Sequence, residues 1–473
     1  MSLIGNKRWA TQSFSSGLGY GSKSFGYYEA AGGTTHLAGQ LTCGAYGTGV
    51  IYVDGGYVVA TNHPAEEASV VPVIYFANMN YSKCALYVKN GGKFSNNRGE
   101  TRVVINSAGG MSGNFTASGE DSYMGLGQLY CGSKNVPMGN RVFFNAIDGG
   151  TIEAWRFSAN DITTETNFVC VGFNGGTIKA RSKGYSVFGS ITTKNGVGPL
   201  TVVRVYEKGG AVDTAGHQEV FSDAPIKAAD GGGVASVQWT PRTGCQYPPL
   251  VFIRGDGYGA SAVAEFDSRS GTVTGVMVTS PGCGYTYAKA EFIFGWEGTS
   301  AGLIPLTNDC VIAQNDGKGS FTKKGAGALT LRAENTWGGD TILAGGVLKS
   351  GVDGAIPAGG TFVFAGGTLD MNGTVLSDGT AMPKKWAVDV RSAIENGTVV
   401  YDGDLAFPEG STLELRGTSE FPDSDASFAI LTVTGSVTGA PALPELDNPR
   451  WKVWWSGKSI KVKKFYGTTV VFR

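Results

Sequence analysis

The stretch Phe168-Val-Cys-Val-Gly-Phe-Asn-Gly-Gly-Thr-Ile178 is the most informative about the fold, because it joins an apolar run to a pair of glycines and a further apolar residue. The same phrase of apolar residues, a polar residue, Gly-Gly, any residue and an apolar residue recurs along the first half of the chain. Its paired glycines begin at positions 55, 91, 109, 149, 175 and 209. Glycine adopts the positive φ angles that other residues resist, so each pair predicts a tight turn between two short strands.

The spacing of the paired glycines predicts a stack of similar units. The successive gaps are 36, 18, 40, 26 and 34, which we interpret as one or two multiples of a unit of roughly 17–20 residues, a length typical of solenoids. A single unit cannot bury its apolar side, whereas stacked units can. We therefore predict a right-handed parallel β-helix over residues 30–225. A β-sandwich or meander is the alternative, since it also uses short alternating strands and glycine turns.

The composition is consistent with this fold and excludes several others. Of the 473 residues, 74 are glycine, 41 % are hydrophobic and 16 % are charged. The glycines lack the strict three-residue period of collagen, and the hydrophobic content excludes disorder. A net charge of −1, from 38 basic and 39 acidic residues, offers no overall attraction to nucleic acid. No run of about 18 apolar residues occurs, so we expect no transmembrane helix.

A duplicated segment lies between residues 234 and 303. One copy contains Gly244-Cys245-Gln246-Tyr247 and the other contains Gly282-Cys283-Gly284-Tyr285. The segment resembles a small glycine-rich module that is common in bacterial surface proteins and phage fibres. Two arrangements of its cysteines stay open: Cys245 and Cys283 form a disulfide between facing copies, or they are two separate buried thiols.

The third region has the most specific pattern. It runs Gly317-Lys-Gly-Ser-Phe-Thr-Lys-Lys-Gly-Ala-Gly-Ala-Leu-Thr-Leu331, followed by Gly338-Gly-Asp-Thr-Ile342 and Gly345-Gly-Val-Leu348. This region resembles the autotransporter-associated β-strand repeat, closely from Gly317 to Leu348 and more loosely as far as Gly373. The resemblance implies a β-helical passenger segment of an exported, often surface-displayed bacterial protein, and it implies no catalytic activity.

These patterns divide the chain into five segments. They are an N-terminal segment or cap (1–29), the glycine-turn β-helix (30–225), the duplicated β module (226–305), the autotransporter-associated repeat (306–380), and C-terminal rungs with a cap (381–473). The predicted fold class is thus an all-β right-handed parallel β-helix, with a small β insertion module and a β-rich C-terminal cap. Trp451, Trp454 and Trp455 lie in a terminal hairpin that could cover the last apolar rung. Their rings could also face a sugar ligand, although we expect packing to be their main role.

No sequence motif for a catalytic residue, a cofactor or a metal occurs, and we predict none. Parallel β-helices can nevertheless hold polysaccharide lyases or glycosidases, and glycoside hydrolysis needs two carboxylates about 5–10 Å apart. The loose candidates for such a pair are Glu66-Glu67, Glu120-Asp121 and Asp161. An acidic cluster in a cleft across consecutive rungs would favour an enzyme, and a smooth polar flank would favour display.

We therefore expect a non-catalytic bacterial surface or secreted protein that acts in adhesion or structural display. Glycans or host-surface components are its expected partners, and its oligomeric state is left open. The alternatives are a carbohydrate-active β-helix enzyme and a phage-fibre-like host-binding protein, for which obligate trimerisation would be diagnostic. The expected location is extracellular or at the cell surface. Because residues 1–9 lack the apolar core of a secretory signal, we expect any signal to have been removed.

Overall fold

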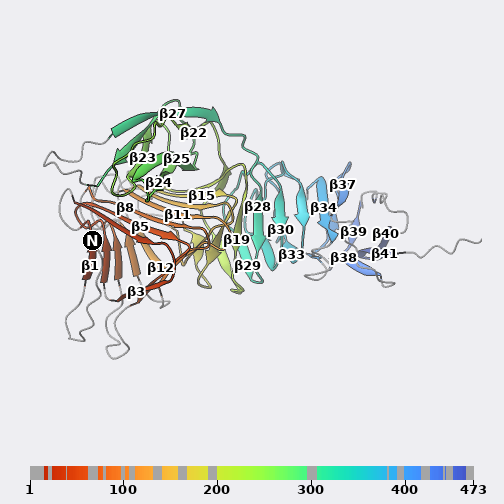
Figure 1. The fold of residues 1–473 in the computed structure, drawn as a ribbon. Coiled ribbons are helices and arrows are strands. Elements are labelled where there is room, and N and C mark those ends of the chain that lie inside the picture. Colours follow the sequence, from red (N-terminus) through yellow and green to blue (C-terminus); the bar gives the residue numbers. More distant parts are fainter. Residues whose placement is uncertain are drawn as a thin grey trace, which may run out of the picture. The chain divides into compact units, whose positions relative to one another are not determined.

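In the computed structural model, the secondary-structure elements of the described residues are β-strands, which confirms the all-β prediction (Figure 1). It describes residues 15–19, 24–38, 40–61, 73–77, 81–96, 102–105, 112–131, 141–157, 168–189, 200–295, 306–380, 383–390, 399–416, 427–439, 443 and 451–464. The chain divides into two compact units. The N-terminal unit comprises residues 1–181, 186–210 and 228–319, and the C-terminal unit comprises residues 182–185, 211–227 and 320–473.

Three ladders of parallel strands build most of the described N-terminal unit (Figure 1). The first ladder is β1 (Ser15–Leu18), β4 (Gln40–Cys43), β7 (Val73–Phe76), β10 (Arg102–Ile105) and the end of β12 (Tyr123–Cys131). The second is β2 (Phe25–Ala30), β5 (Thr48–Asp54), β8 (Lys83–Lys89), β11 (Ser112–Ser118), β13 (Arg141–Ile147), β15 (Phe168–Asn174) and β18 (Leu200–Val205). The third is β3 (Thr34–Ala38), β6 (Tyr57–Thr61), β9 (Lys93–Asn96), the start of β12, β14 (Thr151–Ala154) and β16 (Gly176–Ala180).

From β1 to β14 the chain visits the ladders in the repeating order first, second, third. We call one passage through the ladders a rung. This order, with every pairing parallel, is compatible with the predicted parallel β-helix. The predicted unit length was wrong for this region, because the register-paired positions of the third ladder are 57, 93, 123, 151 and 177. A rung is longer than the predicted unit because it carries strands of several ladders.

The described glycine pairs form the corner between a strand of the second ladder and the following strand, while Gly109-Gly110 lies outside the described residues. The first glycine supplies a positive φ, 93° at Gly149. The second lies against the neighbouring rung, since a Cβ on Gly150 would sit 2.3 Å from the carbonyl oxygen of Ala117. The two positions therefore need glycine for different physical reasons, backbone conformation and close approach.

The interior of the N-terminal unit contains a column of phenylalanine rings. Neighbouring ring centroids are 5.1 Å apart for Phe76 and Phe115, 5.2 Å for Phe115 and Phe144, and 5.0 Å for Phe144 and Phe157. All four side chains are fully buried. The side chains alternate between the two faces of a strand, so every second residue of the apolar runs joins this core.

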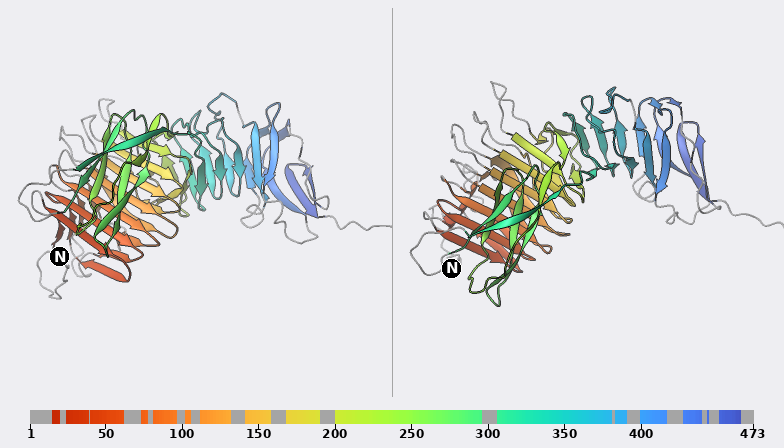
Figure 2. Two further views of the ribbon diagram at one scale, coloured as in Figure 1. Left: turned by 45° about the horizontal axis from the view of Figure 1, so that its top comes forward. Right: turned by 90° about the horizontal axis from the view of Figure 1, so that it is seen from above.

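A six-stranded antiparallel sheet follows in the chain and lies across the second ladder (Figure 2). Its strands are β22 (Gly232–Val237), β23 (Leu250–Gly255), β24 (Ser261–Asp267), β25 (Thr272–Ser280), β26 (Ala288–Ile293) and β27 (Leu306–Gln314). Their spatial order is β22-β27-β26-β23-β24-β25. This order is symmetric: counted from one edge, β22, β23 and β24 occupy the same places as β25, β26 and β27 counted from the other edge. The sheet continues through β27 and so extends past the boundary predicted at residue 305.

This sheet buries the outer face of the second ladder. Phe252, Val263 and Ile293 pack against Ala85 and Tyr87 in one cluster. Strands β5, β8, β13 and β15 of the second ladder are thus largely buried on both faces, which explains why their sequences are apolar runs rather than clean alternations.

The C-terminal unit has two further parallel ladders of shorter strands (Figure 2). One is β28 (Phe321–Lys324), β30 (Thr341–Leu343), β32 (Phe362–Phe364), β34 (Lys385–Asp389) and β37 (Thr412–Arg416). The other is β20 (Val220–Ser222), β29 (Ala328–Leu331), β31 (Val347–Ser350), β33 (Thr368–Asp370), β35 (Val399–Asp402) and β38 (Phe428–Val433). Phe321 pairs with Thr341, and Thr341 with Phe362, so the repeat here is shorter than a rung of the N-terminal unit.

The remaining described strands are short or terminal. They are β17 (Ser186–Phe188), β19 (Gly210–Asp213), β21 (Ile226–Ala228), the pair β36 (Leu405–Ala406) and β39 (Val437–Thr438), and the hairpin β40 (Trp451–Ser456) and β41 (Ser459–Lys464). The hairpin pairs antiparallel with β38 through β41, where the parallel ladder ends. Among the described residues, no helix is long and apolar enough to cross a membrane.

Candidate functional site

The predicted terminal aromatics lie in the hairpin β40–β41. Trp451 is only 6 % exposed. The ring of Trp455 packs edge-on against Phe407, with 5.9 Å between centroids, and Trp454 is half-buried. Trp454 is paired across the hairpin with Lys461, and Trp455 with Ile460. Trp454 and Trp455 are neighbours in the strand and so point to opposite faces, which means that the three rings form no single flat platform.

The predicted cysteine pair is separated in the structure. Cys245 belongs to the core of the six-stranded sheet, where its backbone N–H donates to the Gly271 carbonyl at 2.9 Å. Cys283 instead packs with Tyr206 and Ala229. Both side chains are buried, and they lie in different clusters.

Of the candidate carboxylates for a glycosidase pair, the structure describes only some. Glu66-Glu67 and Asp161 lie outside the described residues. Glu120 and Asp121 form the exposed corner before β12, and Asp121 lines a pocket on the third ladder.

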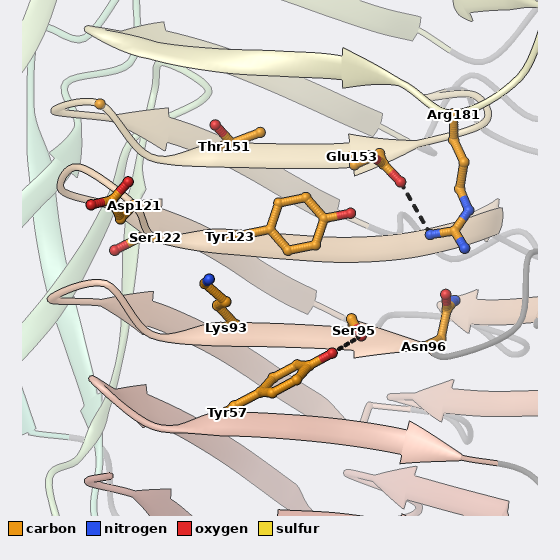
Figure 3. Close-up of a pocket in the computed structure, with 11 residues that line it drawn as sticks. Tyr57, Lys93, Ser95, Asn96, Asp121, Ser122, Tyr123, Thr151, Glu153 and Arg181 are labelled. Carbon is orange, nitrogen blue, oxygen red and sulfur yellow. Dashed lines mark hydrogen bonds and ion pairs between the residues drawn. The ribbon is translucent and has the colours of Figure 1, made fainter. Parts of the chain in front are cut away.

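This pocket has a volume of about 700 Å³ (Figure 3). It crosses β6, β9, β12 and β14 and is bordered by Arg181, just past β16. Its lining is almost entirely polar: Tyr57, Lys93, Ser95, Asn96, Asp121, Ser122, Tyr123, Gly149, Thr151, Glu153 and Arg181.

One column of the pocket comes directly from the corners. The residue after each corner is the first of its strand and faces outward, and parallel register aligns Tyr57, Lys93, Tyr123 and Thr151 across neighbouring strands. The next residue along each strand is apolar and buried in the core, as Phe94 is beside Lys93. Because successive side chains of a strand point to opposite faces, one residue lines the pocket and the next joins the core.

Strand β12 has a glycine where it crosses the pocket. The register places Gly125 between Ser95 of β9 and Glu153 of β14, so β12 has no side chain of its own at this position. The Tyr123 ring lies over Gly125 instead. A Cβ on Gly125 would be 2.9 Å from the Tyr123 hydroxyl, so a larger residue would collide with this ring. The pairing of β12 with β14 shifts between Gly125 and Gly127, an irregularity of the type often found beside functional sites.

The charges at one end of the pocket centre on Glu153, which is 8 % exposed. Its carboxylate is 3.0 Å from Lys179 Nζ and 3.2 Å from Arg181 Nη1, so two cations neutralise it. Burial and the neighbouring Glu153 raise the pKa of Tyr123 well above its usual value, which keeps that hydroxyl protonated. The Tyr57 and Ser95 hydroxyls are hydrogen-bonded at 3.1 Å (Figure 3).

Asn96 is the unusual polar residue of the site. It is 2 % exposed, and neither its Nδ2 nor its Oδ1 atom has a hydrogen-bond partner in the described structure. Buried side-chain amides are nearly always hydrogen-bonded, so an unpaired one beside a pocket indicates a place for a ligand.

The chemistry of the pocket suits binding better than hydrolysis. A glycosidase pair needs one carboxylic acid and one carboxylate facing the same bond. Here Glu153 is held by two cations, while Asp121 is exposed at the other end (Figure 3). Among the residues that the structure describes, no group of three or more His, Cys, Asp and Glu side chains could hold a metal ion.

Of the residues that line the pocket, only Asp121 was a candidate site residue from the sequence. The recurring phrase did contain the signal for the column: its unspecified position after Gly-Gly is occupied by Tyr57, Lys93 and Thr151. Glu153, Asn96 and Arg181 carry no such signal, since only the pairing of strands brings them together.

The chain has a distant likeness to a known autotransporter adhesin. It is similar to the adhesin BmaC autotransporter of Brucella suis biovar 1 (strain 1330), with 24 % identity over 411 residues. The similar region covers 78 % of this chain and 11 % of the relative, so the chain spans a small part of that protein's length. No family model matches the chain, and no solved structure matches it. The likeness is therefore to a segment of an autotransporter adhesin and not to that whole protein.

Proposed function

We propose that the chain is a passenger-type, right-handed parallel β-helix that acts as a non-catalytic adhesion and display module at the bacterial surface. In this proposal the five predicted segments form one scaffold with an inserted β module and a terminal cap. The observation that carries it is the in-register stacking of parallel strands, which repeats outward-facing side chains at about 4.8 Å intervals along a ladder. Such an array favours several weak contacts over one catalytic centre.

The distant likeness to an autotransporter adhesin supports the same function. The buried core of the ladders supports a mechanical role, because each rung is held by its neighbours through parallel hydrogen bonds and the phenylalanine column. A display scaffold needs this rigidity.

A carbohydrate-active enzyme is the second candidate, and one observation favours it: the polar pocket crosses consecutive strands. The neutralised state of Glu153 argues against a hydrolytic pair. A cleavage assay on polysaccharides, read as new reducing ends or unsaturated products, separates the two candidates. Release of products at enzymatic rates would overturn the non-catalytic proposal.

The adhesion proposal is tested by displaying the chain on a non-adherent bacterial host. We expect displaying cells to attach to epithelial cells at least about tenfold better than cells that display an unrelated β-helix of equal length. Purified chain added in excess should block this attachment. Equal attachment by both strains at equal surface levels would contradict the proposal.

A further inference from the structure

We propose that the pocket on the third ladder binds a carboxylate-bearing saccharide, with the sugar carboxylate held between Arg181 and Asn96. The inference rests on the proposed adhesive function and adds the ligand class and the residues that recognise it.

The unpaired amide of Asn96 is the first part of the argument. Its Nδ2 needs an acceptor and its Oδ1 needs a donor, and neither is supplied within the described structure. A carboxylate beside a hydroxyl on one sugar ring offers both, whereas a simple anion offers acceptors alone. Asn96 and Arg181 lie at the same end of the pocket (Figure 3).

The charge at the Arg181 end of the pocket is the second part, because Arg181 and Lys179 together exceed the single charge of Glu153. The Arg181 side chain contacts Glu153 through Nη1, which leaves further N–H donors of the guanidinium for a ligand. Lys179 already neutralises the other oxygen of Glu153. Lys93 is exposed and has no ion-pair partner among the described residues. Asp121 is the opposing charge, and it lies at the far end of the pocket from Arg181 (Figure 3).

The shape of the pocket is the third part. It extends over four neighbouring strands, and its volume of about 700 Å³ suits an oligosaccharide better than a single small anion. The half-buried rings of Tyr57 and Tyr123 provide apolar surface for the C–H faces of sugars, while Ser95 and Thr151 provide hydroxyls.

The test is calorimetric titration of the purified chain with trigalacturonic acid and with its methyl ester, which has the same skeleton without the charge. We expect the acid to bind at least about tenfold more tightly than the ester, because hydrogen bonds to charged groups contribute most. Arg181→Gln and Asn96→Leu should each weaken binding of the acid by about tenfold. Lys93→Gln should weaken it by a smaller factor, and this exposed position leaves the core untouched.

The matched control is Lys208→Gln, which removes the same charge from an exposed ion pair with Asp148 outside the pocket. It should leave the dissociation constant within about twofold. Circular dichroism spectra and melting temperatures verify that each variant is folded. Equal binding of acid and ester, no binding of the acid, or unchanged binding in folded Arg181→Gln and Lys93→Gln variants would each overturn the proposal.

The two proposals can fail separately. If displaying cells attach but trigalacturonic acid does not bind, the saccharide inference is wrong and adhesion stands. If the acid binds the pocket but displaying cells do not attach, adhesion is wrong and the pocket stands.

Discussion

At the scale of single residues, Lys323 shows how the C-terminal ladders use a buried charge. This side chain is fully buried in β28. Its ammonium donates to the carbonyl oxygens of Lys324 at 3.0 Å, Gly325 at 2.7 Å and Gly345 at 2.8 Å. The last of these contacts joins successive repeats, so Lys323 links two glycine corners that carry no side chains of their own.

We predict that Lys323→Met lowers the free energy of unfolding at pH 7 by about 1–3 kcal/mol, because the three carbonyls lose their donor. Burial lowers the pKa of Lys323 to about 8. Between pH 8 and the ordinary pKa near 10.5, the unfolded state therefore binds more protons, and raising the pH stabilises the wild-type fold relative to the variant. Denaturant midpoints of both proteins at pH 7 and 9.5 measure this difference.

The control for Lys323 is Lys349→Met, at a partly exposed ion pair with Asp370. This substitution should cost less than about 1 kcal/mol, with no change in the difference between pH 7 and 9.5. If the Lys323→Met difference is equally independent of pH, the assigned effect of burial on this ammonium is wrong.

At the scale of elements, β13 illustrates a strand buried on both faces. Phe144 points into the phenylalanine column, and Phe143, 7 % exposed, packs with Cys170 and Val202 on the face that the six-stranded sheet covers. Tyr258 of the inserted sheet packs against the same cluster. The inserted sheet is therefore part of the core of the N-terminal unit.

We predict that Phe144→Ala costs about 3–5 kcal/mol of stability and that Phe143→Ala costs at least about half as much, since both leave cavities. Arg141→Gln, at the exposed start of the same strand, should change stability by less than about 0.5 kcal/mol. Urea unfolding followed by circular dichroism measures all three. A Phe143→Ala variant as stable as the wild type would show that the covered face contributes nothing.

At the scale of the whole molecule, the chain has seven cysteines, six of them buried and Cys310 half-buried. Burial raises the pKa of the Cys131 and Cys170 thiols to about 12, and that of Cys310 to about 11. Only the thiolate reacts readily, so buried protonated thiols resist oxidation even in an oxidising compartment. Buried cysteines are thus compatible with a surface location.

We predict that the thiol reagent DTNB modifies Cys310 first and the other six thiols only after unfolding. Because thiols ionise near pH 9 when unfolded and at higher pH when folded, stability should fall as the pH rises above 9. Thiol counts in native and denatured protein, with denaturant midpoints at pH 8 and 10, measure both effects. Fewer than seven thiols in freshly denatured protein, or a Cys245–Cys283 disulfide by mass spectrometry, would contradict this.

Much of the local structure could be predicted from the sequence. The paired glycines predicted corners because their two requirements, positive φ at Gly149 and close approach at Gly150, are properties of single positions. The length of a rung could not be predicted in the same way. It depends on how many strands the chain forms before it returns to the same ladder, and no glycine pair records that number.

Amino-acid order was sufficient to predict that the chain is all-β and that its paired glycines turn the chain. Only the packed fold brought particular strands together, and hence placed Asn96, Glu153 and Arg181 in one pocket. It also placed the inserted sheet over the second ladder. The physical reason is that strand conformation and turns depend on adjacent residues, whereas register and covering depend on the packing of segments far apart in the chain.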